Sequence, residues 1–396
     1  MQAGITICVP SLMLGSILIS GLGFSEAIWA GALGTAIGTA VMTVTGMIGH
    51  DLGVPSVVIL RSSFGKAGSR FLFSLVLGIT LLSWFGIQAQ VCGAAFAHMF
   101  ESITGIALPE LLSTIIWGVI MCVTAVYGVN ALKWLNYIAV PALLIISFYG
   151  AYVVVAENGM DAVLHYAPED SMKFIDGVIM AYGYLTFAGV VAADFTRFQR
   201  SRKDTVLSTT IGIFPLGVIL LILGSIMATL AGTYDIALIM VQIGLPIIGA
   251  VALILATWTT NTTNAYSAGI DMVALLDAKG DKRAAVTLVC GVIGTVLGAI
   301  GLMDYVSNIL SWSSYLFTPI IGVMITDYFV LRKGRAENWD QPEGFGVAAV
   351  VACAAGSIVC FLTTGFSPLY GFLVAAVLYF GLKKAFPALY VFAKKQ

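Results

Sequence analysis

The chain has 396 residues, of which 59% are hydrophobic and only 10% are charged, and its formal net charge is −1. Soluble domains carry roughly 25% charged residues, so a chain this apolar is not a soluble protein and must be solvated by lipid. The small net charge argues against a nucleic-acid-binding protein. The six scattered cysteines show neither Cys-x-x-Cys nor Cys/His spacing, so we expect no Cys/His metal site and no disulfide framework.

About twelve apolar segments of helix length follow one another along the chain, at roughly 20 residues per membrane crossing. They cover residues 2–21, 27–49, 69–99, 109–130, 133–156, 174–196, 206–232, 241–276, 284–302, 305–331, 345–363 and 368–387. No long polar domain interrupts them, and the longest polar connection is residues 156–173. The pattern predicts an all-α integral membrane protein with about twelve transmembrane helices.

The basic residues predict how the chain lies in the membrane. Every Lys and Arg except Lys173 falls in the connections after even-numbered segments or in the C-terminal tail. Basic residues gather on the cytoplasmic side of membrane proteins, so we expect both termini in the cytoplasm and a location in the cell (inner) membrane. The acidic connection at residues 156–173 then faces outward.

Segments 1 and 6 contain patterns that weaken a membrane helix. In "GITICVPSLMLG" (residues 4–15), Pro10 has no N–H and its ring displaces the carbonyl of Thr6, so we expect a break around residues 4–8. In "AYGYLTFAG" (residues 181–189), two glycines flank a polar-aromatic centre. Non-helical backbone at membrane depth is tolerated only where it is buried or lines a cavity, so both places predict an interior site.

Segments 3 and 8 carry polar side chains at membrane depth. Trp84 and Gln88 lie four residues apart and therefore share one helix face. Residues 257–264, "TWTTNTTN", place five Thr and two Asn in eight positions. The alternative is structural: Thr hydroxyls bond back to carbonyls one turn earlier, Thr263 and Asn264 serve helix packing, and the segment 3 pair is a core aromatic with an interhelical contact. Because unpaired amides are costly in lipid, the cluster favours a ligand site.

Segments 1 and 6 are five apart along the chain, as are segments 3 and 8. Because five is odd, a second unit of five helices must run in the opposite direction through the membrane. Interrupted helices at corresponding places in two inverted halves point to the binding site of a secondary transporter. The repeat is predicted from the segment numbering and these four segments, not from residue identity.

Four short motifs resemble one known family. They are "RSSFG" (residues 61–65), "SWFG" (83–86), "ADFTRF" (193–198) and "TWTTN" (257–261). Over nearly its whole length the chain resembles the nucleobase–cation symporter-1 family, and it is most similar to the cytosine permease (purine-cytosine permease) branch. The resemblance implies a five-plus-five inverted-repeat bundle of the leucine-transporter type, followed by two extra helices. The corresponding domains are residues 1–156, residues 174–332 and residues 345–396.

The resemblance also implies a sodium site. Its ligands would be backbone carbonyls of the broken first helix, a carbonyl or side chain of the eighth helix and two neighbouring hydroxyls, which match Gly4, Ile7, Ala256, Thr259 and Thr260. Sodium is a hard cation and takes oxygen ligands, as other hard cations do. Only three residues precede Gly4, where about half of a membrane helix is expected, so we expect either a native start upstream of Met1 or a truncated copy.

For the substrate, the resemblance implies a base stacked on an aromatic ring with polar contacts from three further side chains, which match Trp84, Gln88, Tyr184 and Asn261. Two positions depart from the family pattern. The aromatic that commonly caps the substrate falls at Leu185, and an aromatic of the first helix falls at Cys8. The aromatic residues that could compensate are Tyr182, Tyr184 and Phe187. These departures leave the identity of the base open, within the class of planar heterocycles.

A proton-coupled permease for allantoin, hydantoin, a purine or hydroxymethylpyrimidine is the main alternative. Proton relays usually place Asp, Glu or His within the membrane. Here the carboxylates lie toward the ends of the predicted helices, at Asp176, Asp194, Asp271, Asp304 and Asp327. That placement favours sodium. An enzyme would need a nucleophile or a metal cluster near one membrane face and a channel a repeated pore loop, and the sequence suggests neither, so a non-transport membrane protein is the last alternative.

We therefore predict a secondary active transporter, not an enzyme, that imports a nucleobase-like heterocycle with sodium by alternating access. Cytosine is the first candidate for the substrate. The partners are this small molecule and the lipid bilayer, and we expect a monomer without nucleic acid and without a cofactor other than the coupling ion. The resemblance groups segments 1, 2, 6 and 7 into a bundle that rocks against a scaffold of segments 3, 4, 8 and 9.

Overall fold

The computed structural model describes residues 6–127, 132–168, 170–231, 233–278, 282–387 and 390–391. Its α-helices are α2 (Val9–Ile19), α3 (Phe24–Leu52), α4 (Ser56–Ile59), α5 (Arg61–Gly68), α6 (Ser74–Thr104), α7 (Glu110–Tyr127), α8 (Leu132–Asn158), α9 (Met160–Leu164), α10 (Phe174–Val190), α11 (Ala192–Thr196), α12 (Arg202–Ala231), α13 (Ile236–Gln242), α14 (Pro246–Leu275), α15 (Arg283–Ala299), α16 (Val306–Ile325), α17 (Val347–Leu362) and α18 (Ser367–Ala385). Short helical turns of other types are η1 (Ser69–Phe73), η4 (Leu302–Tyr305), η5 (Thr326–Leu331) and η6 (Ala336–Asn338), and the two strands are β1 (Phe345–Gly346) and β2 (Tyr390–Val391).

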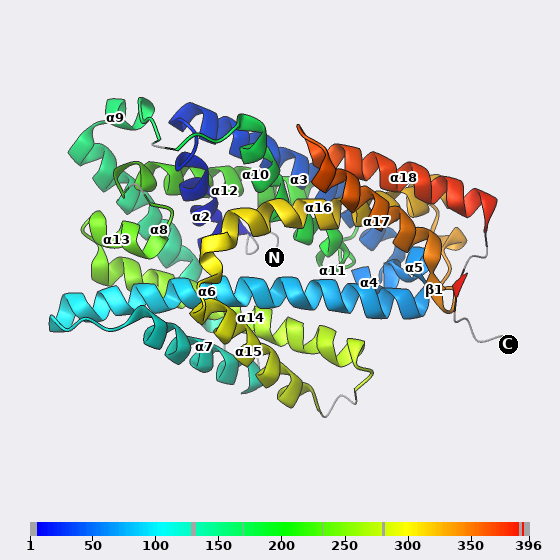
Figure 1. Ribbon diagram of the computed structural model, residues 1–396, viewed down its shortest axis with the longest axis horizontal. Coiled ribbons are helices and arrows are strands. Elements are labelled where there is room, and N and C mark those ends of the chain that lie inside the picture. Colours follow the sequence, from blue (N-terminus) through cyan, green and yellow to red (C-terminus); the bar gives the residue numbers. More distant parts are fainter. Residues whose placement is uncertain are drawn as a thin grey trace.

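Seven helices of the described residues are long and apolar enough to cross a membrane, and four shorter apolar helices accompany them. Helix α14 is 30 residues long and carries the polar segment. Together with the seven long and four shorter apolar helices it makes twelve, the number of predicted membrane segments. The predicted all-α membrane fold is therefore confirmed. The long helices run along the longest axis of the molecule, with α9 and α13 near one end and α4, α5 and β1 near the other (Figure 1).

Two predicted segments are divided in the structure. The sixth, residues 174–196, becomes α10 and α11 on either side of Val191. The eighth, predicted to begin at residue 241, is divided between α13 and α14. Gly244 adopts a left-handed φ of 77°, and Pro246, at the start of α14, has no N–H with which to continue the preceding helix.

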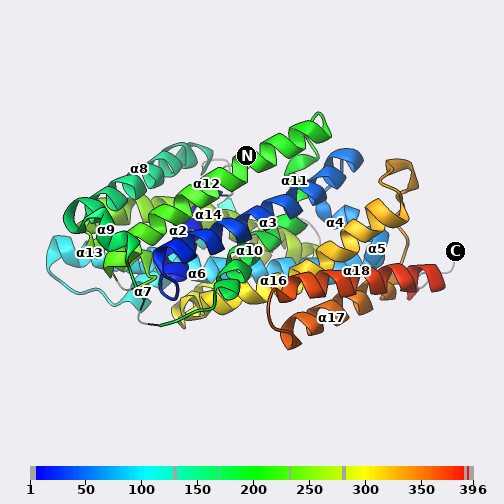
Figure 2. The ribbon, with the colours of Figure 1, turned by 90° about the horizontal axis from the view of Figure 1, so that it is seen from above.

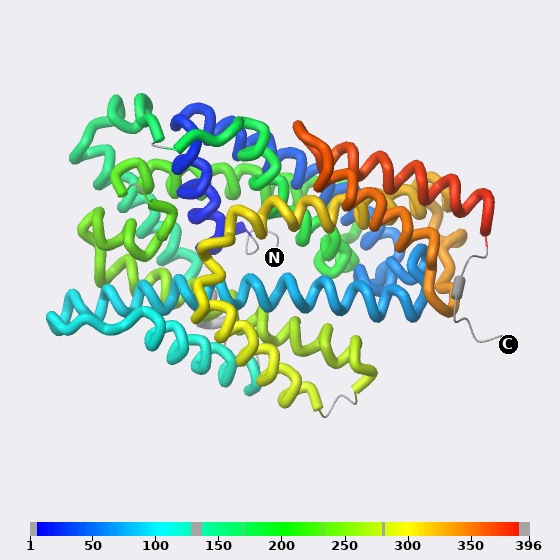
Figure 3. The backbone as a smooth tube through the Cα atoms, in the orientation of Figure 1, coloured from blue at the N-terminus to red at the C-terminus, as the bar shows by residue number. Residues whose placement is uncertain are grey.

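Eight of the apolar helices form two groups. Helices α2, α3, α10 and α12 pack against one another, and α6, α7, α14 and α15 form the second group, in which α6 and α14 make extensive contact. Figure 3 shows α6 running along the second group, with the first group above it. From above, α8 lies on one side of the first group and α16, α17 and α18 on the other (Figure 2). These groups match the bundle and the scaffold that the family resemblance implies.

Small residues allow α2 and α12 to cross closely. A Cβ atom added at Gly15 would lie 2.1 Å from the Leu221 carbonyl oxygen, and one added at Gly224 would lie 2.1 Å from the Leu12 carbonyl oxygen. Ser225 fastens the crossing, because its hydroxyl donates to the Gly15 carbonyl at 3.1 Å. Close backbone approach with interhelical hydrogen bonds is how membrane helices associate without a hydrophobic driving force.

A buried carboxylate connects several elements near β1. Asp327 of η5 is 4% exposed and accepts hydrogen bonds from Tyr379 of α18 at 2.7 Å and from the Arg332 Nε atom at 3.0 Å. The Ser62 hydroxyl of α5 donates to the same carboxylate. The motif "RSSFG" therefore contributes a structural contact at this end of the molecule, far from the polar segment of α14.

Candidate functional site

The first described helix begins after a backbone break. Ile7 and Cys8 lie outside α2, and Cys8 has extended backbone angles, φ −151° and ψ 164°. The Thr6 carbonyl accepts hydrogen bonds from the Cys8 N–H at 3.0 Å and from the Ser11 hydroxyl at 2.5 Å. In a continuous helix this carbonyl would bond to residue 10, but Pro10 has no N–H. The break predicted for this part of the chain is present.

The break also leaves a carbonyl without a partner. The Ser11 N–H donates to the Cys8 carbonyl at 3.1 Å rather than to Ile7. Within the described residues no donor bonds to the Ile7 carbonyl, which was predicted as a sodium ligand. The second predicted carbonyl, that of Gly4, lies outside the described residues.

The interruption of the sixth segment falls later than predicted. Residues 181–189 are helical, and the helix stops at Val191, with φ −93° and ψ 10°. The two glycines serve packing instead. A Cβ atom at Gly183 would lie 1.9 Å from the Leu310 carbonyl oxygen of α16, and the Gly189 carbonyl accepts a hydrogen bond from Thr45 of α3 at 2.7 Å.

Trp84 and Tyr184 form an aromatic pair between the scaffold and the bundle. Their ring centroids are 6.2 Å apart with an interplanar angle of 79°, and both side chains are half-buried. The Tyr184 hydroxyl lies 2.8 Å from the Ser11 hydroxyl and 3.2 Å from the Cys8 sulfur. Because Ser11 has a single hydroxyl proton, which it donates to Thr6, Tyr184 must donate to Ser11.

Among the aromatic residues of α10, Tyr184 is therefore the one next to Trp84. Tyr182 instead accepts a hydrogen bond from Thr318 of α16 at 3.0 Å, and Phe187 packs edge-on against Phe317 at 5.8 Å. Leu185 was predicted at the substrate position, but it is buried against α3, where a Cβ atom at Gly38 would lie 2.7 Å from it. Tyr184 packs against the same small cluster, and the role of Leu185 as a substrate contact stays a prediction.

Gln88 holds a polar atom that lacks a partner. Its side chain is 2% exposed, and its Oε1 atom is buried without a hydrogen bond from any described residue. Leaving a buried acceptor unpaired costs about 1–3 kcal/mol, so such an atom requires an explanation. A ligand that donates a hydrogen bond one helical turn from Trp84 would provide one.

The Thr hydroxyls of α14 donate to carbonyls one turn earlier. Thr259 and Thr260 both donate to the Ala256 carbonyl, at 3.0 Å and 2.9 Å. The structural alternative considered for this segment therefore accounts for the hydroxyl protons. No described residue donates to these two hydroxyl oxygens, however, and the arrangement gathers three oxygen atoms at one place on the helix.

Asn261 fastens α14 to its neighbours. Its Nδ2 atom donates to the Phe85 carbonyl of α6 at 2.9 Å and lies 3.3 Å from the Met121 sulfur of α7, and its oxygen accepts from Asn264 at 3.2 Å. The residue is fully buried. Its role as a substrate contact stays a prediction, because in this structure the amide is bonded within the scaffold.

Sequence reasoning missed Ser11. This hydroxyl connects Tyr184 to the break before α2, yet a single Ser in an apolar helix is an ordinary packing residue by pattern alone. The available signal was its place one residue after Pro10, next to carbonyls that a proline leaves without a donor.

Comparison with known proteins supports the same class of molecule. A family profile described as "Permease for cytosine/purines, uracil, thiamine, allantoin" matches residues 1–383. The chain belongs to this permease family. It is 30% identical over 382 residues to the cytosine permease of Escherichia coli strain K12, covering 95% of this chain and 88% of that protein. The resemblance to the nucleobase–cation symporter-1 family is thereby confirmed, and the permease is a transporter and not an enzyme.

Solved structures show the fold of this permease. It superposes on the inward-facing conformation of Mhp1 with a TM-score of 0.86 and 21% identity, covering 98% of this chain and 91% of that one. A closed conformation of Mhp1, a nucleobase-cation-symport-1 family transporter with bromovinylhydantoin bound, superposes with a TM-score of 0.80 and 22% identity, covering 98% and 92%. The permease therefore has the predicted inverted-repeat fold of the leucine-transporter type.

Proposed function

We propose that this permease imports a nucleobase or a similar planar heterocycle, with cytosine as the first candidate, by symport with sodium. The observation that carries the proposal is the buried Gln88 oxygen, which accepts no hydrogen bond from the described residues and lies one helical turn from the Trp84–Tyr184 pair. The similarity to a cytosine permease supports the choice of substrate.

The aromatic pair suits a flat ligand. An indole face offers stacking area that any base can use, worth about 1–3 kcal/mol per base. A carboxamide has one acceptor and two donors, so Gln88 can pair with a ring edge that shows both kinds of group. An amino-acid substrate would instead need a partner for its ammonium group, and no charged side chain is among the predicted contacts, Trp84, Gln88, Tyr184 and Asn261.

Sodium suits the oxygen atoms on the facing helices. The Ala256 carbonyl and the Thr259 and Thr260 hydroxyls would supply ligands from α14. The Ile7 carbonyl, to which no described residue donates, would supply one from the break. Ile7 packs against the same apolar core as Ala256, and α2 contacts α14. A cation bound there would hold the backbone break before α2, in the bundle, close to α14 in the scaffold. Its oxygen ligands would not have to include a buried carboxylate.

Proton coupling is the competing proposal for the same chain. Two carboxylates of the spanning segments are engaged in structural contacts: Asp327 in the cluster near β1, and Asp194 with the Ser56 N–H at 2.8 Å. We favour sodium because the oxygen set of α14 and the Ile7 carbonyl match a hard cation. Allantoin, hydantoin, a purine or hydroxymethylpyrimidine are the substrates to compare with cytosine.

Transport would follow from movement of one helix group against the other. Tyr184 belongs to the bundle and Trp84 to the scaffold, so a base stacked at this pair contacts both groups. We propose that the basic connections face the cytoplasm, which places the connection at residues 156–173 outside the cell membrane. We also propose that the unit is a monomer with the domain bounds given by the predicted repeat.

Uptake into proteoliposomes tests the proposal. The purified permease is offered tritiated cytosine, uracil, adenine, hypoxanthine, allantoin and hydantoin, each with an inward sodium gradient and with the gradient replaced by choline. We expect saturable uptake of at least one base, cytosine first, that needs sodium. Uptake driven equally well by a proton gradient in choline would reject sodium coupling, and preference for amino acids or sugars over every base would reject the substrate class.

A further inference from the structure

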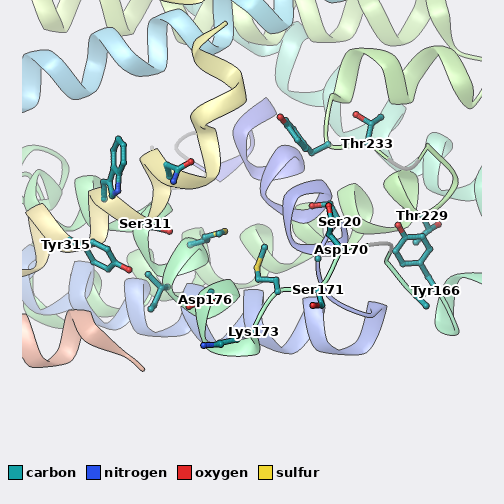
Figure 4. A pocket seen from close by; sticks show the side chains of 18 of the residues that line it. Ser20, Tyr166, Asp170, Ser171, Lys173, Asp176, Thr229, Thr233, Ser311 and Tyr315 are labelled. Atoms are coloured by element: carbon teal, nitrogen blue, oxygen red, sulfur yellow. The ribbon is translucent and has the colours of Figure 1, made fainter. Parts of the chain in front are cut away.

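A pocket lies apart from the Trp84–Tyr184 pair, and neither of these two residues lines it. It has a volume of about 1050 Å³ and lies where the connection at residues 156–173 meets the ends of α2, α10, α12 and α16. Figure 4 shows Ser20 and Thr229 on one side, Ser311 and Tyr315 on α16 at the other, and Asp176 with Lys173 at the start of α10. The lining is therefore polar and aromatic.

The contact between α10 and α16 lies beside the Trp84–Tyr184 pair. Met180 lines the pocket and lies one helical turn before Tyr184 on α10. Beyond it, α16 is pressed against α10, because a Cβ atom at Gly183 would lie 1.9 Å from the Leu310 carbonyl oxygen. The α10 face that carries Met180 into the pocket thus leads on to Tyr184.

Helix α16 repeats the side-chain pair of α6 inside this pocket. Asn308 and Trp312 both line it and are four residues apart, so a carboxamide and an indole share one helix face, as Gln88 and Trp84 do on α6. Trp312 is 46% exposed, and among the described residues neither side chain has a hydrogen-bond or ring partner. An aromatic platform with a free carboxamide one turn away is suited to stacking a flat ring and reading its edge.

The charges at the pocket disfavour an anionic ligand. Asp170, Lys173 and Asp176 line it, so two acidic groups are opposed by one basic group. An anion would meet a small excess of negative charge. Stacking and hydrogen bonding, rather than net charge, would then select the ligand.

We propose that this pocket is a second binding station, in which a neutral planar heterocycle stacks on Trp312 and bonds to Asn308. From there the heterocycle enters the proposed site at the Trp84–Tyr184 pair, called the central site below. The inference rests on the proposed function, because it takes the transported heterocycle as the ligand. The station holds one molecule while the central site holds another, so the permease binds two molecules per chain at saturation.

Equilibrium dialysis of the purified permease measures this stoichiometry. The probe is tritiated cytosine, or whichever base of the uptake panel enters proteoliposomes fastest. Wild type should bind two molecules per chain. Trp312→Ala and Asn308→Ala should each bind one at saturation of the central site, with the second site weakened at least about tenfold. Trp84→Ala should also bind one, and Trp312→Phe, which keeps a stacking ring, should bind two.

Trp29→Ala is the matched control, because Trp29 of α3 is 69% exposed and does not line the pocket. It should bind two molecules. A wild type that takes up a base but binds one molecule per chain, with Trp312→Ala unchanged, would overturn the second station and leave the proposed function intact. If no base of the panel is taken up or bound, the proposed function fails and the station fails with it.

Uptake kinetics provide a second readout if one variant folds poorly. Loss of the station should raise the KM for uptake several-fold in Trp312→Ala while kcat stays within twofold of wild type, because the central site is intact. An unchanged KM in both Trp312→Ala and Asn308→Ala would contradict the proposal, since it would assign the indole to an interfacial aromatic.

Discussion

The phenol oxygen of Tyr184 lies 2.8 Å from the hydroxyl oxygen of Ser11, and Ser11 in turn donates to the Thr6 carbonyl at 2.5 Å. This chain of two hydrogen bonds runs from the aromatic pair to the backbone break before α2. The break also contains Ile7, whose carbonyl we propose as a sodium ligand. A side chain that we propose as a contact of the base is thereby connected to the backbone that would hold the ion.

Tyr184→Phe should reduce transport efficiency about two- to tenfold, the value of one ordinary hydrogen bond, while uptake remains measurable. The ring that faces Trp84 is kept, and the hydroxyl's contacts with Ser11 and the Cys8 sulfur are lost. Initial rates at several sodium concentrations are the measurement, and the sodium needed for half-maximal uptake should rise. Tyr182→Phe is the control, because that hydroxyl bonds to Thr318 on α16, and its sodium dependence should match wild type. Wild-type behaviour of Tyr184→Phe would show that the bond has no part in coupling.

Trp84→Ala should abolish uptake of every base, because stacking on the indole is common to all of them. Gln88→Leu should instead change the order of preference among bases, because it removes the carboxamide and keeps the volume. Competition of unlabelled bases against tritiated cytosine measures both effects. Trp29→Ala, which removes an exposed indole, should transport like wild type. Normal uptake by Trp84→Ala would exclude the aromatic pair as the binding site.

The break before α2 was predictable because its cause is local. Pro10 cannot donate to Thr6, and no other part of the protein is needed to reach that conclusion. The position of the interruption in the sixth segment was not predictable from the sequence. Gly183 contacts α16 and Gly189 contacts α3, and both glycines remain inside a continuous helix. Those contacts come from residues more than a hundred positions away in the chain.

The residues of the candidate site show the same distinction between local and tertiary causes. Helix periodicity placed Gln88 and Trp84 on one face, but whether Tyr184 or Leu185 would face them depended on the rotation of α10 against α3. The role of Asn261 depended on a carbonyl of α6 that its sequence neighbours do not indicate. Local chemistry predicted which segments are special, and tertiary packing decided which side chains of those segments meet.

Thr260→Ala should weaken sodium binding by about 1–3 kcal/mol, the value of one hydrogen bond to a charged group. The sodium concentration needed for half-maximal uptake should therefore rise, while the variant still folds. The hydroxyl bonds back to Ala256 within its own helix, so its loss leaves no interhelical partner unpaired. Uptake against sodium concentration is the measurement, with expression checked by fluorescence-detected size exclusion. Thr262→Ala is the control, because Thr262 makes the same kind of bond, to Trp258 at 2.8 Å, and is not a proposed ligand. Equal sodium dependence in both variants would reject Thr260 as a ligand.

Asp327→Asn should destabilise the permease by about 1–3 kcal/mol, because it weakens bonds to Tyr379 and Arg332 in a buried cluster. Thermal unfolding in detergent is the measurement, and uptake per folded molecule should stay near wild type. Asp340→Asn breaks the other ion pair of Arg332, but that carboxylate is 65% exposed, so its loss should have little effect. If uptake is lost while thermal stability is unchanged, the cluster serves transport rather than the fold.

The proposed orientation predicts which surface residues face the outside of the cell. Asp161 belongs to the acidic connection after α8, and Glu343 lies at the opposite end of the molecule, next to Lys66 and before β1; their side chains are 92% and 53% exposed. Five of the six native cysteines are buried and the sixth is half-buried, so background labelling should be low. A membrane-impermeant maleimide should label Asp161→Cys in intact cells and Glu343→Cys only in inside-out vesicles, because basic connections stay in the cytoplasm. The reverse labelling pattern would show that the protein has the opposite orientation, with the Trp312 pocket on the cytoplasmic side.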